Sequence, residues 1–226
     1  MKSKLLNILR YFSPGLYLKL KYFILKNKKS DINEHLPTLS TFSSECETIF
    51  ETGVRGVVSS WGLLYGLSKN KFNQKRLFLN DIESVNTESI GFVARKLGIQ
   101  FDFIQKNNLQ LEMDNNFKFD LTFIDTLHVY GQLKRELEKF APVTKKYIIL
   151  HDTTVDADKG EVIRLNFNPD EIYEKTNIPM DELLKGLWPA VEEFVFKNKN
   201  WEIYKRYTNN NGLTILRRRE DNQIAS

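Results

Sequence analysis

Short β-rich segments alternate with longer helical segments through the middle of this chain, and no other feature restricts its fold as strongly. Strands are predicted at residues 46–50, 76–80, 101–104, 120–124 and 146–150, and helices at residues 59–69, 86–97 and 130–141. A β-α-β series with right-handed crossovers forms a parallel sheet that has helices on both faces. The sequence therefore predicts an α/β fold with a mostly parallel sheet.

The C-terminal part of the chain predicts a different strand pairing. A helix is expected at about residues 181–197, and two β-rich segments, WEIYKRY at 201–207 and LTILRR at 213–218, follow it. Asn211 and Gly212 lie between these segments, and both residue types tolerate the positive φ that tight hairpin turns require. We therefore expect an antiparallel hairpin that closes one edge of the sheet.

The length of the chain limits its domain organisation. With 226 residues, 41% of them hydrophobic, it suffices for one full α/β domain and is short for two. We expect a basic helical arm at residues 1–40, the domain at 41–220 and a tail at 221–226. Within the domain, residues 153–179 form a long connection, which is typical of a lid or a substrate-binding loop and is sometimes disordered. A lid is the expectation.

Cysteine content and hydropathy indicate the compartment. The single cysteine, Cys46, excludes an intrachain disulfide and a thiolate-based zinc site, and it fits a reducing cytoplasm. The apolar residues near the start are interrupted by Pro14, Gly15 and several lysines, so no run approaches the roughly 20 residues that span a bilayer, and no secretory signal is recognised. We expect a cytoplasmic protein.

Positive charge is concentrated at the start of the chain. Residues 1–29 carry eight basic side chains and no acidic one, so this arm contributes +8 to the net charge of +4 and leaves −4 for the rest. Apolar residues recur in the arm at helical spacing, before and after Ser13-Pro14, which suits a helix cap and a first helical position. These residues are Leu5, Leu6, Ile8, Leu9 and Phe12, followed by Leu16, Tyr17, Leu20, Phe23 and Ile24.

Two basic amphipathic helices have two common uses. They lie on an anionic membrane surface, or they dock on protein, either the domain itself or a second copy in a homo-oligomer. The sequence favours neither use for residues 1–29. A nucleic-acid partner is not expected, because the rest of the chain is acidic and carries no recognised nucleic-acid motif.

Acidic residues end, or directly follow, four of the five predicted parallel strands. They are Glu51, Asp81, Asp125 and Asp152. Parallel sheets bind ligands in the crevice beyond the carboxyl ends of their strands, so the four are candidates for one site. An acid after a strand often caps a helix instead, and any one of them alone is weak support. Their convergence favours a ligand site.

The first predicted strand runs into the turn ETGVRG. Gly53 and Gly56 lie in it, and the next helix begins near Ser59, which exposes backbone N–H groups to a ligand. The turn lacks the G-x-G-x-x-G pattern, which argues against a dinucleotide ligand and a nicotinamide dehydrogenase. Asp81, at the end of the second strand, is suited to bind the hydroxyl pair of a ribose, and a helix N-cap is the alternative.

Two of the three histidines lie beside acids at predicted strand ends, in Asp125-x-x-His128 and in His151-Asp152. An ordinary histidine titrates near ~6.5 and accepts a proton at neutral pH, so either could act as a base. A structural role is the alternative, with His128 bonded to a backbone carbonyl and His151 packed at the strand end. The presence of acids beside both histidines favours a functional role.

The order Glu51-Thr-Gly-Val, Asp81, Asn107, Asp125-x-x-His128 and His151-Asp152-Thr153, closed by a hairpin, resembles the class I S-adenosylmethionine-dependent methyltransferases over about residues 45–218. The segments ETGVRG, IDTLHVYG, LHDTT, GLWPAVEEF and YTNNNGLT are most similar to the branch with macrolide-sugar O-methyltransferases and cephalosporin-hydroxylase-like proteins. The resemblance implies a Rossmann-like methyltransferase sandwich, S-adenosylmethionine as cofactor, and a sugar hydroxyl of a glycan or polysaccharide precursor as acceptor.

The resemblance also implies a role for each matched residue. It places the methionine end of the cofactor on the turn at 51–56, the ribose on Asp81 and the adenine near Asn107, where many relatives have an acid. The cofactor-binding residues would be Glu51, Gly53, Arg55, Gly56, Ser59, Asp81, Asn107, Asn108 and Asp125. Asp125 and His128 would be catalytic.

A magnesium site is implied in the same way, with Asp125, Asp152 and His151 as ligands. Related metal-dependent sugar methyltransferases have a pair of adjacent acids where this chain has His151-Asp152. The histidine departs from that pattern, so a metal site with fewer carboxylates, or none, stays open.

Two other classes of function also stay open. A metal-dependent hydrolase could use Asp125, His128, His151 and Asp152, and it would require a metal and ignore the methyl donor. A non-catalytic protein could keep the same fold, and its donor pocket would then be filled by side chains. The sequence does not determine the acceptor or the oligomeric state.

Overall fold

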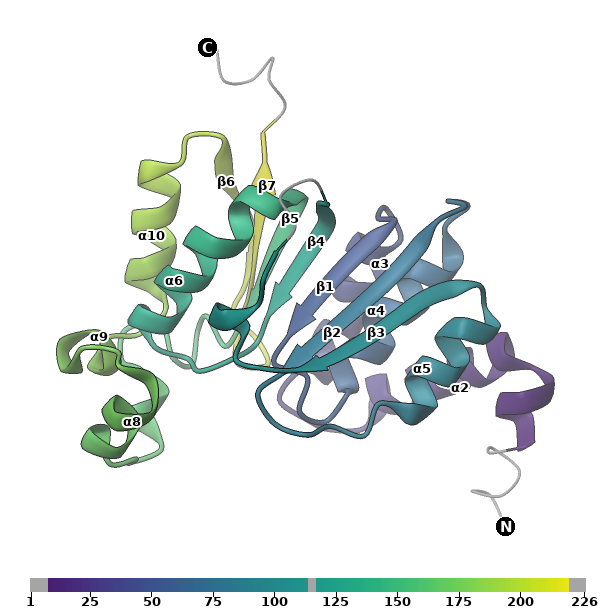
Figure 1. Ribbon diagram of the computed structural model, residues 1–226, viewed down its shortest axis with the longest axis horizontal. Helices are drawn as coiled ribbons and strands as arrows, with labels where there is room; N and C mark the ends of the chain where they lie inside the picture. The colour runs from purple at the N-terminus through teal and green to yellow at the C-terminus, as the bar shows by residue number, and fades with distance from the viewer. Residues whose placement is uncertain (1–7, 114–116, 220–226) are drawn as a thin grey trace. The chain divides into compact units, whose positions relative to one another are not determined.

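A computed structural model of the protein describes residues 8–113 and 117–219. Within these residues seven strands form one mixed sheet in the order β3-β2-β1-β4-β5-β7-β6 (Figure 1). The chain divides into two compact units, residues 1–108 with 119–121 (the first unit) and residues 109–118 with 122–226 (the second unit). Strand β4, Phe119–Ile124, therefore begins in the first unit and ends in the second.

The first unit is built on parallel strands. Its strands are β1 (Thr48–Thr52), β2 (Lys75–Asp81) and β3 (Ile99–Gln105), and its helices are α2 (Pro14–Asn27), α3 (Leu36–Ser43), α4 (Val58–Lys69) and α5 (Glu88–Lys96), with a 3-10 helix at Asn33–His35. Both β1 and β3 pair with β2 in parallel. The rings of Phe50, Phe78 and Phe119 stack on one another with centroids 5.2–6.0 Å apart. Aromatic side chains from three strands thus form the centre of the core.

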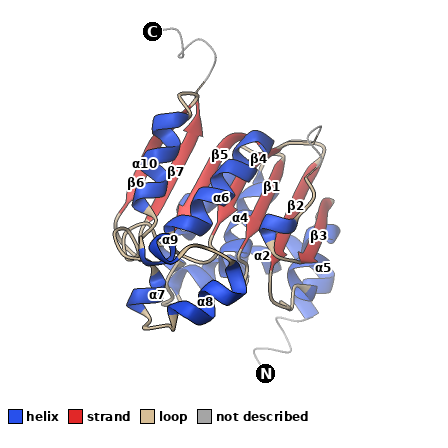
Figure 2. Cartoon of the chain, turned by 60° about the vertical axis from the view of Figure 1, so that its left-hand side comes forward, coloured by secondary structure: helices blue, strands red, loops and turns tan. Residues whose placement is uncertain are grey.

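The second unit carries the antiparallel hairpin. Its elements are β5 (Thr144–His151), β6 (Trp201–Tyr207), β7 (Leu213–Arg218), α6 (Tyr130–Phe140), α7 (Glu161–Arg164), α8 (Pro169–Thr176), α9 (Met180–Leu184) and α10 (Trp188–Lys197), with a 3-10 helix at Ala141–Val143. A further 3-10 helix, Asn108–Gln110, begins in the first unit and ends in the second. Strand β7 pairs antiparallel with both β5 and β6. Helices α6 and α10 lie side by side on one face of the strands (Figure 2).

The predicted antiparallel hairpin is confirmed in β6 and β7, and the backbone of its turn explains why it forms. In the turn between β6 and β7, φ is positive at Asn210 (46°), Asn211 (70°) and Gly212 (98°). Asparagine and glycine are the residue types that adopt this region at least cost. The predicted fold, a mostly parallel sheet that ends in an antiparallel hairpin, is thus confirmed.

The single helix predicted at about 181–197 is wrong. The structure divides it into α9 and α10, which Gly186 separates. A Cβ atom at Gly186 would lie 2.3 Å from the carbonyl oxygen of Ala157, so only glycine allows this close approach. Pro189 lies in the first turn of α10, where it begins a helix but could not continue one.

Residues 153–179 are folded. They form turns and the helices α7 and α8 beside a small core of Val129, Val162, Ile178 and Leu183. The disordered alternative for this connection is therefore wrong. Its use as a lid stays a prediction.

The predicted arm is helical where the structure describes it. Residues 8–12 are helical and α2 follows Ser13. Leu5 and Leu6, like the predicted tail at 221–226, lie outside the described residues. The expected boundary at residue 40 falls inside α3, and the division into arm, domain and tail stays a prediction. Among the described residues, every helix is too short or too polar to cross a membrane.

Candidate active site

The turn between β1 and α4, in the first unit, has a strained backbone. Its φ is positive at Gly53 (84°), Arg55 (34°) and Val57 (59°), and for a β-branched residue such as valine this is rare. Asp81 holds the turn, because its Oδ2 accepts hydrogen bonds from the N–H groups of Val54 (2.7 Å) and Arg55 (2.9 Å). The end of β2 thus fixes the turn that precedes the N-terminus of α4.

Asp81 does not cap a helix. Its Oδ1 accepts a hydrogen bond from the N–H of Glu83 (2.9 Å), whereas α5 begins only at Glu88, after Thr87. The N-cap alternative for Asp81 is therefore wrong. Its predicted contact with a ribose is not tested by these bonds.

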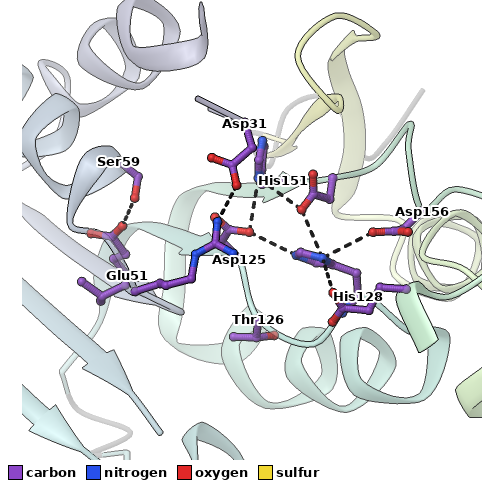
Figure 3. A network of polar contacts seen from close by, with 12 residues as sticks. Asp31, Glu51, Ser59, Asp125, Thr126, His128, His151 and Asp156 are labelled. Atoms are coloured by element: carbon purple, nitrogen blue, oxygen red, sulfur yellow. Dashed lines mark hydrogen bonds and ion pairs between the residues drawn. The ribbon is translucent and has the colours of Figure 1, made fainter. Parts of the chain in front are cut away.

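Glu51 and Ser59 meet behind the turn. The carboxylate of Glu51, fully buried at the end of β1, accepts a hydrogen bond from the Ser59 hydroxyl in the first turn of α4 (Figure 3). Arg55 forms an ion pair with Asp31, from the segment that joins α2 to α3. The strained turn is therefore anchored by side chains of β1, β2 and the segment after α2.

A polar network joins the ends of β1 and β2 to Asn108, one of the two residues predicted to contact the adenine. Asn108 is buried and donates from Nδ2 to the Thr52 hydroxyl (3.0 Å), which in turn donates to Asn80 Oδ1 (2.9 Å). Asn80 also donates to the carbonyls of Ile104 and Lys106. Thr52 and Asn80 were not predicted from the sequence. The feature that could have pointed to them is a polar side chain at the end of an apolar strand.

The first unit therefore brings together most of the predicted cofactor residues. Gly53, Arg55 and Gly56 lie in the strained turn, and the others lie at the ends of β1 and β2, at the start of α4 and just after β3. Asp125, also predicted to bind the cofactor, belongs to the second unit.

The second unit brings together both predicted pairs of histidine and acid. Asp125 follows β4, and its Oδ1 lies 3.1 Å from His128 Nε2 and 3.2 Å from His151 Nδ1 (Figure 3). On the other side of the imidazole, His128 Nδ1 lies 3.1 Å from Asp152 Oδ2. The predicted convergence of Asp125, His128, His151 and Asp152 is thus observed at the ends of β4 and β5.

Two further carboxylates approach the same imidazole. Asp156 Oδ2 and Glu161 Oε2 each lie 3.4 Å from His128 Nδ1, and the backbone N–H of His128 donates to Glu161 Oε1 (2.9 Å). Arg164 makes a bidentate contact with Asp156 at 2.6 and 2.7 Å. Asp156 and Glu161 were not predicted from the sequence. For Asp156 the spacing of four residues from Asp152 could have pointed to the site.

The cluster controls the protonation of its members. Burial lowers the pKa of His128, but hydrogen bonds to Asp125, Asp156 and Glu161 outweigh burial and raise this pKa well above its usual range. For Asp125, burial raises the pKa, and the bonds from His128 and His151 outweigh it, so that the pKa lies well below the usual range. Both shifts favour the charged pair, a protonated His128 that faces an ionised Asp125.

His151 and Asp152 are also perturbed. Burial lowers the pKa of His151, and the bond to Asp125 outweighs burial and raises it. Burial raises the pKa of the Asp152 carboxyl. Asp152 further has a positive φ of 56°, which is uncommon for a residue with a side chain and is often found at functional sites.

The donor atoms of this cluster fit a divalent cation. One atom each from Asp125, His128 and Asp152 lie within 4.8 Å of one another, as do atoms of His128, Asp156 and Glu161. Asp152 Oδ1 is buried and has no hydrogen-bond partner among the described residues, so it can accept a ligand. Carboxylate oxygens suit a hard cation such as Mg²⁺. His151 is in neither group, and its role as a ligand stays a prediction.

The strand order and the edge hairpin define the Rossmann-like fold of class I methyltransferases. The O-methyltransferase TomG from Streptomyces achromogenes, solved with SAM, has a TM-score of 0.56 and 12% identity over 85% of this chain and 82% of its own. The SAH-bound methyltransferase PaMTH1 from Podospora anserina has a TM-score of 0.51 and 13% identity over 90% of this chain and 88% of its own.

An O-methyltransferase from Bacillus cereus, in complex with SAH, has a TM-score of 0.51 and 14% identity over 89% of this chain and 90% of its own. At identities this low, the structural similarity shows a shared fold alone. No protein-family model matches the chain, and no curated protein sequence matches it. The class I methyltransferase fold is thereby confirmed, and the resemblance to the macrolide-sugar branch stays a prediction.

Proposed function

We propose that this protein is an S-adenosylmethionine-dependent O-methyltransferase that acts on a sugar hydroxyl of a glycan or polysaccharide precursor. The observation that carries the proposal is the meeting of Asp125, His128, His151 and Asp152 at the ends of β4 and β5, in a fold shared with O-methyltransferases such as TomG. This cluster has the groups that can orient a hydroxyl and take up its proton.

The methyl donor would bind to the first unit. The N-terminus of α4 follows the strained turn directly and has no side-chain cap, so its first backbone N–H groups would suit the carboxylate of a methionine moiety. Asp81 would accept hydrogen bonds from the ribose, and Asn107 and Asn108 would contact the adenine. TomG was crystallised with SAM, and the Bacillus cereus enzyme was crystallised with SAH.

The second unit would serve the acceptor. Transfer of a methyl group to a hydroxyl is an in-line displacement, so correct alignment of the hydroxyl supplies much of the rate. His128 would take the proton of that hydroxyl, and Asp125 would orient the imidazole. Asp125 and Asp152 would hold a divalent cation, whose positive charge would make a bound sugar hydroxyl more acidic. The same charge would offset the carboxylates that raise the pKa of His128, so that the imidazole could accept a proton.

Calorimetric titration with S-adenosylmethionine and with S-adenosylhomocysteine tests the proposal. The wild-type protein should bind both ligands saturably, and Asp81→Ala should lose this binding. Asp102→Ala is the matched control, because Asp102 is an acid in the neighbouring strand β3 whose partner is Arg76 on the surface. Absence of binding to folded wild-type protein would contradict the proposal.

The cluster also fits a metal-dependent hydrolase, because two histidines and four carboxylates come together in it. Such an enzyme would hydrolyse its substrate without a methyl donor. The same titration separates the two functions, since the hydrolase has no use for S-adenosylmethionine.

A further inference from the structure

One side of helix α2 exposes a row of large apolar side chains. Phe12, just before the helix, and Leu16, Leu20, Phe23 and Ile24 within it are exposed by 85%, 48%, 38%, 44% and 49%. We call these five residues the outer ridge. Leu16, Leu20, Phe23 and Ile24 are spaced by four, three and one residues, so they lie on one side of the helix.

The opposite side of α2 already packs on the first unit. Tyr17, Leu18 and Tyr22 are buried, and the ring of Tyr22 stacks on Tyr65 of α4 with centroids 4.1 Å apart. Of the helical face expected from the sequence, only Tyr17 is buried. The outer ridge is therefore not used to hold α2 on the fold, and an exposed row of large apolar side chains often marks a surface that binds a partner.

The charged residues of α2 and of the two positions that follow it, up to residue 29, are all positive. Lys19 and Lys26 are seven residues apart and so lie on one flank of the helix, and Lys28 and Lys29 follow its end. No acidic residue occurs in residues 1–29. Long lysine side chains can keep their ammonium groups in a polar layer while the neighbouring apolar residues are buried below it.

We propose that the outer ridge and the lysines beside it dock on an anionic lipid surface. The ridge would enter the boundary between head groups and acyl chains, and the lysines would contact anionic head groups. A second copy of the chain is a poorer partner, because a two-fold contact through this face would set one basic arm against another. Neutral lipid would leave the lysines without a complementary charge.

Co-sedimentation of the full-length protein with vesicles tests this proposal. Vesicles that contain phosphatidylglycerol should bind the wild-type protein about tenfold or more tightly than vesicles of phosphatidylcholine alone, and added salt should reduce the difference. Leu20→Ser combined with Phe23→Ser should abolish binding to both. Phe196→Ser, which removes an exposed aromatic side chain of α10, is the matched control and should bind like wild type.

A charge variant separates the two contributions. Lys28→Gln combined with Lys29→Gln should weaken binding to anionic vesicles and leave the weak binding to phosphatidylcholine unchanged. Thermal unfolding of each variant checks that the fold is intact. Equal binding to both kinds of vesicle, or no binding to either, overturns the proposal. A wild-type dimer that the ridge variant loses, without any binding to vesicles, would identify a second copy as the partner instead.

Discussion

His128 is the residue on which the candidate active site depends. Both ring nitrogens face carboxylates, with Asp125 on the Nε2 side and Asp152, Asp156 and Glu161 on the Nδ1 side. A buried imidazole is ordinarily neutral, since burial disfavours the charged form. Here the surrounding negative charge prevails, and the charged ring in turn holds the carboxylates together. Protonation of His128 therefore contributes to the stability of the second unit.

The stability of the metal-free protein should depend on the pH through His128. Its folded pKa is raised above the unfolded value near 6.5, so its contribution is complete below that value and is lost as the pH rises through the folded pKa. His151, which faces Asp125, contributes with the same sign. The pKa of Asp125 is lowered, and its own contribution is lost only in acid.

We therefore expect His128→Gln to lower the free energy of unfolding most below about pH 6.5 and progressively less as the pH rises above that value. Denaturant titrations in the presence of a chelator, at several pH values, measure the difference from wild type. The matched control is Leu133→Ala, because Leu133 is a buried apolar residue of α6 and its loss should be the same at every pH. A constant difference for His128→Gln would show that the histidine is neutral in the cluster.

At the scale of elements, the position of α4 is set by its contact with α3. Gly62 and Gly66 face α3, and a Cβ atom at Gly66 would lie 1.9 Å from the Ser43 hydroxyl and 2.2 Å from the Ser40 carbonyl oxygen. Glycine at this position allows the two backbones to approach closely. Because the strained turn leads directly into α4, this contact also positions the backbone N–H groups of the candidate donor site.

Gly66→Ala should therefore destabilise the protein. Overpacking of this kind typically lowers the free energy of unfolding by about 1–3 kcal/mol, although alanine is the better helix former by about 1 kcal/mol. Gly15→Ala is the matched control in α2, because its Cβ would meet only the side chain of Leu97 at 3.9 Å, and it should be neutral or stabilising. Denaturant titration measures both variants. Equal stability of the two would show that α3 can move away without loss.

At the scale of the whole molecule, charge is distributed unevenly in two ways. The arm at residues 1–29 is basic and the remaining chain is acidic. Within the second unit, four carboxylates lie around one imidazole, with Arg164 as a further cation beside Asp156. Like charges at short distance destabilise a folded state, so a bound cation should stabilise the protein as a whole.

Magnesium should accordingly raise the midpoint of thermal unfolding. At a hundredfold excess over Kd, a ligand that binds only the folded state adds about 2.7 kcal/mol, which is about 5–10 °C for a chain of this size. Asp152→Asn should lose this shift, and Asp158→Asn, at an exposed acid of the same segment, should keep it. Differential scanning calorimetry with and without chelator measures the shift. No shift in wild type would contradict the metal site.

From the sequence alone we predicted the five parallel strands, the three helices between them, the edge hairpin and the positions of Asp125, His128, His151 and Asp152 at strand ends. These features are encoded locally, by hydrophobic periodicity and by turn residues such as Asn211 and Gly212, so they can be recognised from near neighbours. The meeting of these acids and histidines followed from one rule, that parallel strands end at the same edge of a sheet.

Which other groups join these acids and histidines depends on how distant parts of the chain fold together. Glu161 is 33 residues from His128 and approaches it because the segment after β5 folds back, which no local pattern encodes. The division of α9 from α10 depends on the contact of Gly186 with Ala157, and the exposure of the outer ridge depends on which side of α2 packs against α4. These outcomes are set by packing between distant residues, and so is the protonation of His128.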